Sequence, residues 1–305
     1  MVAPFRRAHP DIGVSYYPFA NSAQGLALLE SRRQTAEIDV CMLDSATAKI
    51  ATDEGLLDII APGSLPVLAE LTPRAFITGV AGPAVTFNPL ALLYAPLQVK
   101  PVPTSWTVLW DAGFDRKIAI AAPPDRAGTA LTLIANAIFG DGDYQRSIDA
   151  GLTAIGGMAS QVRSWDPRPD IFSYLIDGNA VLGPGWNAQG QLHAQDSGGR
   201  LAVAVPAEGT VYQINTINQV KGSRDPEAAR IFLAYVLSAG AQKAVAERMC
   251  YGPVNTAAQI SPAALARTGA TPAHLARMIQ VDWAAITRMQ EFITNQWRRR
   301  ILQLP

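Results

Sequence analysis

The chain has 305 residues, of which 49% are apolar and 16% are charged, and its 25 basic residues balance 25 acidic ones. This composition excludes a disordered chain, because there is ample apolar material for a core. A net charge of zero excludes the basic surface that nucleic acid or anionic lipid would require. A mean hydropathy of +0.11, with no apolar run of about 18 residues, argues against a membrane span. At this length a chain usually divides into two lobes.

Strands alternate with helices over the first 220 residues, which is the pattern of parallel-type sheets flanked by helices. Strands are predicted at 11–17, 39–43, 85–94, 117–121, 162–165, 180–183, 201–205 and 210–217. Helices are predicted at 23–33, 46–54, 130–139 and 171–177, followed by 228–237, 241–248 and one amphipathic stretch over 271–302. The extended segments near 95 and 215 are the candidate linkers, so the chain is expected to cross between lobes twice.

The sequence contains no convincing catalytic motif. Its three histidines have no metal-binding spacing and no neighbouring nucleophile, and neither a G-x-S-x-G elbow nor a P-loop occurs. The Gly183-Pro184-Gly185 turn contains a proline that spoils a dinucleotide loop. Asp141 and Asp143 are typical turn formers. A transferase or hydrolase is therefore disfavoured.

Cys41 and Cys250 are too few and too far apart for a zinc site. They are predicted to be buried free thiols, with a single long-loop disulfide as the alternative. The first seven residues lack the apolar region and cleavage site of a secretory signal. Either a signal was removed and replaced by a start methionine, or the protein is cytosolic.

Aromatic and small polar residues lie at the ends of the predicted strands or, as for Phe87 and Asn88, within the third, and open parallel sheets bind ligands at strand ends. Each residue alone also fits a core aromatic or a turn former, and their shared position favours a binding site. Arg126, Gly128 and Thr129 begin a helix, whose free N–H groups favour an anionic group. The candidate ligand-binding residues are Tyr17, Phe19, Asp44, Ser45, Phe87, Asn88, Arg126, Gly128, Thr129, Trp165, Asp166, Trp186, Asn187, Tyr212 and Asn215.

Seven phrases occur together in a familiar order. They are 38–45 (IDVCMLDS), 55–57 (GLL), 103–106 (PTSW) with 109–111 (LWD), 117–120 (KIAI), 183–187 (GPGWN), 206–209 (PAEG) and 251–255 (YGPVN). In this order they resemble the extracellular solute-binding proteins of ABC importers, in the polyamine-type (spermidine/putrescine) branch. The resemblance runs from Pro4 to the 283–297 helix.

The resemblance implies a two-lobed periplasmic-binding-protein fold (type II) with a two-strand hinge. Residues 1–95 and 216–260 are expected to form one lobe, and residues 96–215 and 261–305 the other. The lobes would close on a small-molecule solute and pass it to a membrane permease. Tyr251 joins the expected ligand contacts. No cofactor, metal ion, catalytic residue or nucleic acid is implied, and a periplasmic monomer is expected.

Two departures from the family pattern bear on the ligand. The strand and glycine-containing loop that usually precede the first helix are lacking, so one sheet strand and one edge of the site are expected to be missing. Asn215 stands where polyamine binders carry an acidic residue, and a buried ammonium needs a carboxylate partner. Asp166 could supply one charge, whereas Arg126 favours a small carboxylate or phosphonate. A cytosolic ligand-sensing effector-binding module is the alternative function.

Ferric iron is disfavoured as a ligand. Iron-binding relatives use adjacent tyrosines, and the Tyr16-Tyr17 pair lies at the wrong end of this chain.

Overall fold

The computed structural model describes residues 1–35, 37–61 and 63–303. Its strands are β1 (Val40–Asp44), β2 (Leu57–Asp58), β3 (Ala84–Tyr94), β4 (Ile118–Ala119), β5 (Val162–Ser164), β6 (Leu182–Trp186), β7 (Ala202–Ala204), β8 (Thr210–Val220) and β9 (Met278–Ile279). Its α-helices are α1 (Val2–Ala8), α2 (Ser22–Ser31), α3 (Ser45–Asp53), α4 (Arg126–Phe139), α5 (Asp149–Gly157), α6 (Ile171–Ile176), α7 (Asn187–Asp196), α8 (Pro226–Leu237), α9 (Ala239–Met249), α10 (Pro262–Arg267), α11 (Pro272–Ala276) and α12 (Trp283–Arg300).

The described strands form one sheet in the order β1-β8-β3-β6-β4-β5, with β2 and β9 beside β8 and β7 beside β3. The pairs β4–β5, β4–β6 and β8–β9 are parallel, whereas β1, β8, β3 and β6 pair antiparallel. The sheet is thus mixed, with helices on both faces.

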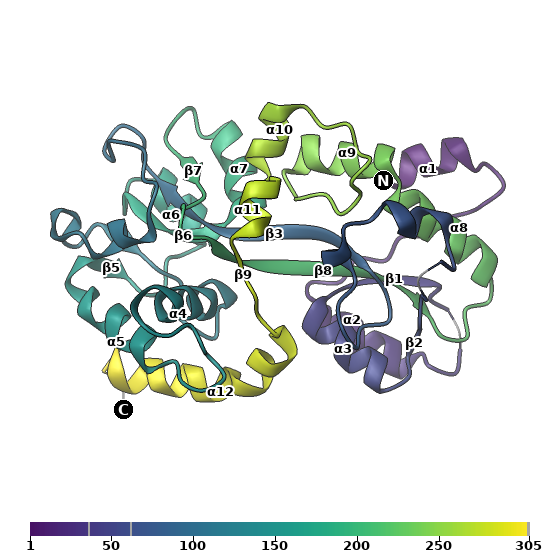
Figure 1. Cartoon of the computed structure of the whole chain (residues 1–305), viewed down its shortest axis with the longest axis horizontal. Coiled ribbons are helices and arrows are strands. Elements are labelled where there is room, and N and C mark those ends of the chain that lie inside the picture. The colour runs from purple at the N-terminus through teal and green to yellow at the C-terminus, as the bar shows by residue number, and fades with distance from the viewer. Residues whose placement is uncertain (36, 62, 304–305) are drawn as a thin grey trace.

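Two long strands cross the middle of the molecule and join its two lobes (Figure 1). The first half of β3 pairs with β8 through Ala84↔Thr216 to Pro89↔Tyr212, and its second half pairs with β6 and β7. We call the lobe that contains β1, β2, α2, α3 and α8 the first lobe, and the lobe that contains β4, β5, β6, α4 and α5 the second lobe. The fold is the expected two-lobed α/β fold, in which β3 and β8 form the hinge.

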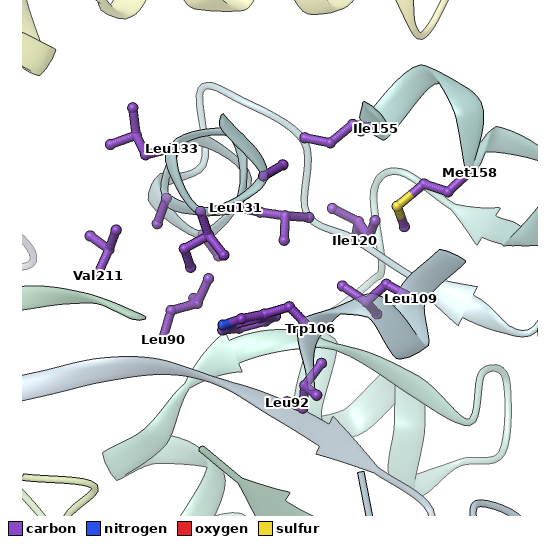
Figure 2. Packing of buried hydrophobic residues seen from close by; sticks show 14 of the residues in the cluster. Leu90, Leu92, Trp106, Leu109, Ile120, Leu131, Leu133, Ile155, Met158 and Val211 are labelled. Atoms are coloured by element: carbon purple, nitrogen blue, oxygen red, sulfur yellow. The ribbon is translucent and has the colours of Figure 1, made fainter. Parts of the chain in front are cut away.

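The two lobes have largely separate apolar clusters, and within the second lobe alternate side chains of β3 enter different helix layers. In the second lobe, Leu90 and Leu92 of β3 pack with α4 and with buried Trp106, as Figure 2 shows. Leu93 points to the opposite face and packs with α6. In the first lobe, Leu43 packs under α2 and α3 in a separate cluster.

The 103–106 and 206–209 phrases hold each other in place. The Trp106 backbone N–H donates to Glu208 Oε1 at 3.1 Å, and the Trp106 indole N–H donates to the Gly209 carbonyl at 2.9 Å. The Ala207 N–H donates to the Thr104 carbonyl at 2.8 Å. These family phrases therefore stabilise the second lobe, since buried polar groups must find partners.

Most predicted elements are present, with two exceptions. Residues 11–17 have no strand pairing, so the predicted strand there is wrong. The 271–302 stretch is broken into α11, β9 and α12, because 278–279 pairs with β8 and Asp282 caps a new helix by accepting from the Ala285 N–H. Cys41 and Cys250 are buried free thiols, as predicted. Among the described residues, no helix combines the length and hydrophobicity needed to cross a bilayer.

Candidate ligand-binding site between the lobes

The first lobe contributes a buried carboxylate where β1 ends. Asp44 is 5% exposed and caps α3, because its Oδ1 accepts from the N–H groups of Ala46 and Thr47, both at 3.1 Å. Its Oδ2 accepts from the Thr47 hydroxyl at 2.9 Å. The Asp44 N–H donates to Ser22 Oγ at the start of α2 at 2.9 Å. This capping network fixes the carboxylate where the first lobe meets the second.

The second lobe contributes a guanidinium at the same place. Arg126 is the first residue of α4, and its Nη2 lies 3.1 Å from Asp44 Oδ2. The guanidinium carbon lies 5.9 Å from the centre of the Trp283 ring, within the range of a cation–π contact. The Arg126–Asp44 pair therefore joins the two lobes directly.

Trp283 links this pair to the hinge. Its indole N–H donates to the Tyr212 carbonyl on β8 at 2.7 Å, and its side chain is buried in the core of the second lobe. Ala46 of α3 belongs to the same apolar cluster, and α12 also lies against α3. We call Asp44, Ser45, Arg126 and Trp283 the interlobe seam.

The hinge strands supply polar groups beside the seam. Asn215 on β8 is the register partner of Asp44 on β1 and of Thr86 on β3. The Asn215 side-chain amide donates to Thr86 Oγ1 at 3.1 Å. Ser45, the first residue of α3, is buried next to Asp44. Three adjacent strands thus bring polar side chains to one place.

Asp44 stays ionised despite its burial. Burial by itself raises the pKa of this carboxyl, but the Arg126 guanidinium and the hydrogen bonds from Thr47 and Ser22 outweigh it. The net pKa of Asp44 is below its ordinary value. Among the described residues Asp44 is the one Asp, Glu, Lys, Arg or His that is buried. Such a group is seldom buried without a partner.

Three other predicted residues make contacts that hold α4, α12 and the loop before α4 in place. A Cβ on Gly128 would lie 2.4 Å from the Ala121 carbonyl oxygen, so this glycine lets α4 approach the loop after β4 closely. Thr129 is fully buried, and its hydroxyl accepts from Gln290 Nε2 of α12 at 3.2 Å. The Trp165 carbonyl accepts from the Ala122 N–H at 2.9 Å. Trp165 also meets the Trp297 ring edge-on at 5.6 Å.

Four predicted residues make contacts within the fold, away from the seam. Asn88 is buried and binds the first turn of α7, by accepting from the Ala188 N–H and donating to Gln189 Oε1. Asn187 donates to the carbonyls of Cys250 and Arg267. The Tyr212 hydroxyl donates to the Gly269 carbonyl at 2.7 Å, and Phe87 packs edge-on against the Tyr212 ring. Asn88 thus holds α7 against β3, whereas Asn187, Tyr212 and Phe87 connect the sheet and α7 to the α9–α11 segment.

The remaining predicted residues are more peripheral. Tyr17 is 65% exposed beneath Arg32, whereas Phe19 is half-buried against Leu43. Asp166 is exposed and pairs with Arg168 at 2.9 Å.

Trp186 ends β6 opposite Leu90 and packs on the core of the second lobe. Tyr251 is half-buried, and burial raises the pKa of its hydroxyl. In the part of the chain that the structure describes, no group of three His, Cys, Asp or Glu side chains could hold a metal ion.

Sequence reasoning missed Trp283, Ser22 and Thr86. The sequence pattern places Trp283 only within a long amphipathic stretch, and the one signal for its position is the Asp282 cap, which makes it the first residue of a helix. Thr86 and Ser22 are polar residues beside strand and helix ends, a signal too common to single them out.

A family model described as bacterial extracellular solute-binding protein matches residues 1–273. The chain belongs to this family. Its members are receptors of transport systems, so the family supports the solute-receptor function over a cytosolic sensor or an enzyme.

One curated relative is similar to this chain in sequence, and two solved structures are similar to it in fold. The γ-aminobutyric acid-binding protein of Pseudomonas aeruginosa is 23% identical over 227 residues, which are 71% of this chain and 62% of that protein. The chain thus spans about three fifths of the length of this relative. The GABA receptor Atu4243 has a TM-score of 0.75 at 19% identity, with coverage of 97% and 90%.

The spermidine/putrescine ABC transporter substrate-binding protein of Streptococcus pneumoniae has a TM-score of 0.81 at 15% identity, with coverage of 98% of this chain and 94% of that chain. The names of these proteins specify different ligands, γ-aminobutyric acid and spermidine or putrescine. The polyamine-type branch is therefore one of several to which the chain is similar, and the similarity does not determine the class of its ligand.

Proposed function

We propose that this receptor binds a small polar organic solute between its lobes, at the interlobe seam, and delivers the solute to an ABC permease. The observation that carries the proposal is the Asp44–Arg126 pair, which brings opposite charges from the two lobes to within 3.1 Å. A solute that contacts both lobes stabilises the closed receptor through interactions that the open receptor lacks. The seam supplies such contacts from both sides.

Arg126 is the proposed anchor for a carboxylate or phosphonate group of the solute. A guanidinium has five N–H donors, and the contact with Asp44 uses Nη2. The Arg126 side chain is 37% exposed, so a part of it is accessible to a ligand. Carboxylates and phosphonates match the guanidinium geometry in a bidentate manner. The Trp283 ring under the guanidinium fixes its orientation.

A polyamine fits this seam less well. A linear diamine requires an anionic partner for each ammonium group, since a buried unpaired charge is costly. The hinge position expected to be acidic is Asn215, whose amide is hydrogen-bonded to Thr86. Asp166 lies on an exposed loop and pairs with Arg168. Asp44 alone would then hold an amine beside the positive charge of Arg126.

We propose that residues 1–95 and 216–260 form the first lobe and that residues 96–215 and 261–305 form the second. In support, the hinge strand β3 ends just before the boundary at 95/96, and the hinge strand β8 spans the boundary at 215/216. We further propose that the receptor acts as a periplasmic monomer, in line with a family of extracellular receptors.

A thermal-shift screen of amines, amino acids, carboxylates and phosphonates tests the proposal, since a solute that binds the native state raises Tm by mass action. Small-angle scattering with and without the best solute then measures closure. Arg126→Ala is expected to abolish the shift, and Asn215→Ala to weaken it. Arg146→Ala, which removes an exposed guanidinium from the second lobe, is the matched control. If no solute of the screen stabilises the protein, the proposed function is wrong.

A further inference from the structure

We infer that the interlobe seam is a latch, which holds the two lobes together when no solute is bound. The inference goes beyond the proposed function, because every contact on which it depends is made between side chains of the protein itself. An ion pair, an apolar contact and a helix–helix contact meet at the first turn of α3. In each of them the first lobe contacts groups that the second lobe or the hinge holds in place.

The ion pair between Asp44 and Arg126 is the polar part of the latch. Asp44 Oδ2 and Arg126 Nη2 lie 3.1 Å apart and come from opposite lobes. The Asp44 side chain is 6% exposed, and three hydrogen bonds from the backbone of Ala46 and from Thr47 fix its carboxylate at the start of α3. Because the cap holds the carboxylate, it cannot follow Arg126 when the lobes separate. Opening therefore breaks this pair.

The first turn of α3 also buries apolar surface against the second lobe. Ala46 is 2% exposed, and it belongs to the apolar cluster that contains Trp283 and Ile286 of α12. Helix α12 lies against α3, and Figure 1 shows its N-terminal end reaching from the second lobe toward α3. Separation of the lobes would expose this contact to water, which is unfavourable for apolar surface.

The start of α12 is anchored to the second lobe and to the hinge. The Trp283 indole N–H donates to the Tyr212 carbonyl on β8 at 2.7 Å, and the Asp282 N–H donates to the Tyr144 hydroxyl oxygen of the second lobe at 2.8 Å. Strand β9, which precedes α12, pairs with β8. The Arg126 guanidinium lies over the Trp283 ring. Movement of the first lobe must therefore break the seam contacts, since α12 cannot move along with α3.

The latch changes the balance between the open and closed receptor. A two-lobed receptor distributes between these forms according to their difference in free energy. The seam contacts exist only in the closed form, so they favour that form without any contribution from a solute. Solute entry then requires the latch to open transiently, and loss of a seam contact should increase the population of the open form.

Double electron–electron resonance on the solute-free receptor measures this balance. Spin labels are attached through Asp53→Cys at the end of α3 and Asp141→Cys beyond α4, which replace exposed side chains on opposite lobes. The native thiols of Cys41 and Cys250 are buried and remain unlabelled in the folded protein. We expect one main short distance, and a small-angle scattering profile of the solute-free wild type that matches the profile calculated from this structure.

Variants of the seam test the polar and apolar parts of the latch separately. Asp44→Asn, which keeps an oxygen that can cap α3, and Arg126→Gln should each add a longer distance and lower the closed-to-open ratio about fivefold, which corresponds to about 1 kcal/mol. The double variant should lower the ratio by less than about twofold more than either single variant, because both remove the same contact. Ala46→Gln introduces a larger side chain at the apolar contact and should make the longer distance the main one.

A control variant separates the latch from unspecific effects of charge. Glu247→Gln removes the charge that faces Lys243 on α9, within one helix, and should leave the distance distribution unchanged. Circular dichroism and Tm verify that each variant is folded.

The outcomes separate the latch from the proposed function. The latch is wrong if the solute-free wild type has as its main distance the longer one of Ala46→Gln. It is also wrong if Asp44→Asn and Arg126→Gln leave the distribution unchanged. Neither result contradicts the proposed function, because a receptor that is open without solute can still close on one. If no solute of the broad screen binds, the proposed function fails, whereas the latch, measured without solute, is unaffected.

Discussion

Replacement of Asp44 is expected to separate two roles of one carboxylate, capping and interlobe pairing. Asp44→Ala removes the acceptor for the Ala46 and Thr47 N–H groups and the partner of Arg126. Asp44→Asn retains a side-chain oxygen for the cap but removes the charge. Asp53→Asn, near the end of the same helix, breaks an exposed i,i+4 pair with Lys49 and serves as the control.

The expected magnitudes follow from the contacts. Loss of an N-cap costs about 1 kcal/mol. The ion pair is worth about 1 kcal/mol after a discount for solvent screening, because the Arg126 side chain is 37% exposed. The buried Thr47 hydroxyl loses an acceptor, which costs about 1 kcal/mol more. We therefore expect Asp44→Ala to lower the free energy of unfolding by about 3 kcal/mol, Asp44→Asn by about 1 kcal/mol, and Asp53→Asn by less than about 0.5 kcal/mol.

Urea denaturation of the full chain at pH 7, followed in parallel by tryptophan fluorescence and circular dichroism, measures these differences. A double-mutant cycle of Asp44→Asn with Arg126→Gln gives the coupling energy of the pair, expected to be about 1 kcal/mol. Equal losses for the Asn and Ala variants would refute the capping role. A coupling energy below about 0.3 kcal/mol would show that the pair does not join the lobes in solution.

Three further predictions concern acid, thiols and the hinge. The pKa of Asp44 is lowered in the folded protein, so the stabilisation by its carboxylate is fully present above the ordinary pKa of about 4 and is lost as pH falls through the lower folded value. The difference in free energy of unfolding between wild type and Asp44→Asn should therefore shrink below about pH 4. A difference that stays constant with pH would contradict this prediction. Burial raises the pKa of Cys41 to about 12 and the pKa of Cys250 above its ordinary value. Both thiols should therefore resist Ellman's reagent in the native protein at pH 8 and react with it in denaturant. Rapid labelling of Cys41 in the native protein would disprove its burial. A Cβ on Gly82 would lie 2.0 Å from the Ile217 carbonyl oxygen of β8, so Gly82→Ala should lower the free energy of unfolding by about 1–3 kcal/mol in the same urea assay. Gly240→Ala on α9, where nothing lies within 4 Å, should leave that energy unchanged or raise it, and equal losses in both variants would contradict the clash.

The sequence by itself determined the elements and the family. Apolar runs and capping residues placed β3, α3, α4 and α8 close to their observed positions, because these signals are local. The same phrases that indicated the family, such as 103–106 and 206–209, bind each other and stabilise the second lobe. They indicate the fold and leave the ligand open. The predicted strand at 11–17 failed because its alternating pattern finds no neighbouring strand with which to pair.

Only the tertiary structure decided which polar residues meet. Asp44 and Arg126 are 82 positions apart in sequence, and Trp283 is a further 157 positions away. Their contact depends on the way β3 and β8 bring the lobes together, and no local pattern encodes that approach. Asn187 and Tyr212 have the same strand-end signature as Asp44, yet their hydrogen bonds go to the α9–α11 segment. Position at a strand end is a short-range property, whereas the partner across a cleft is set by long-range packing.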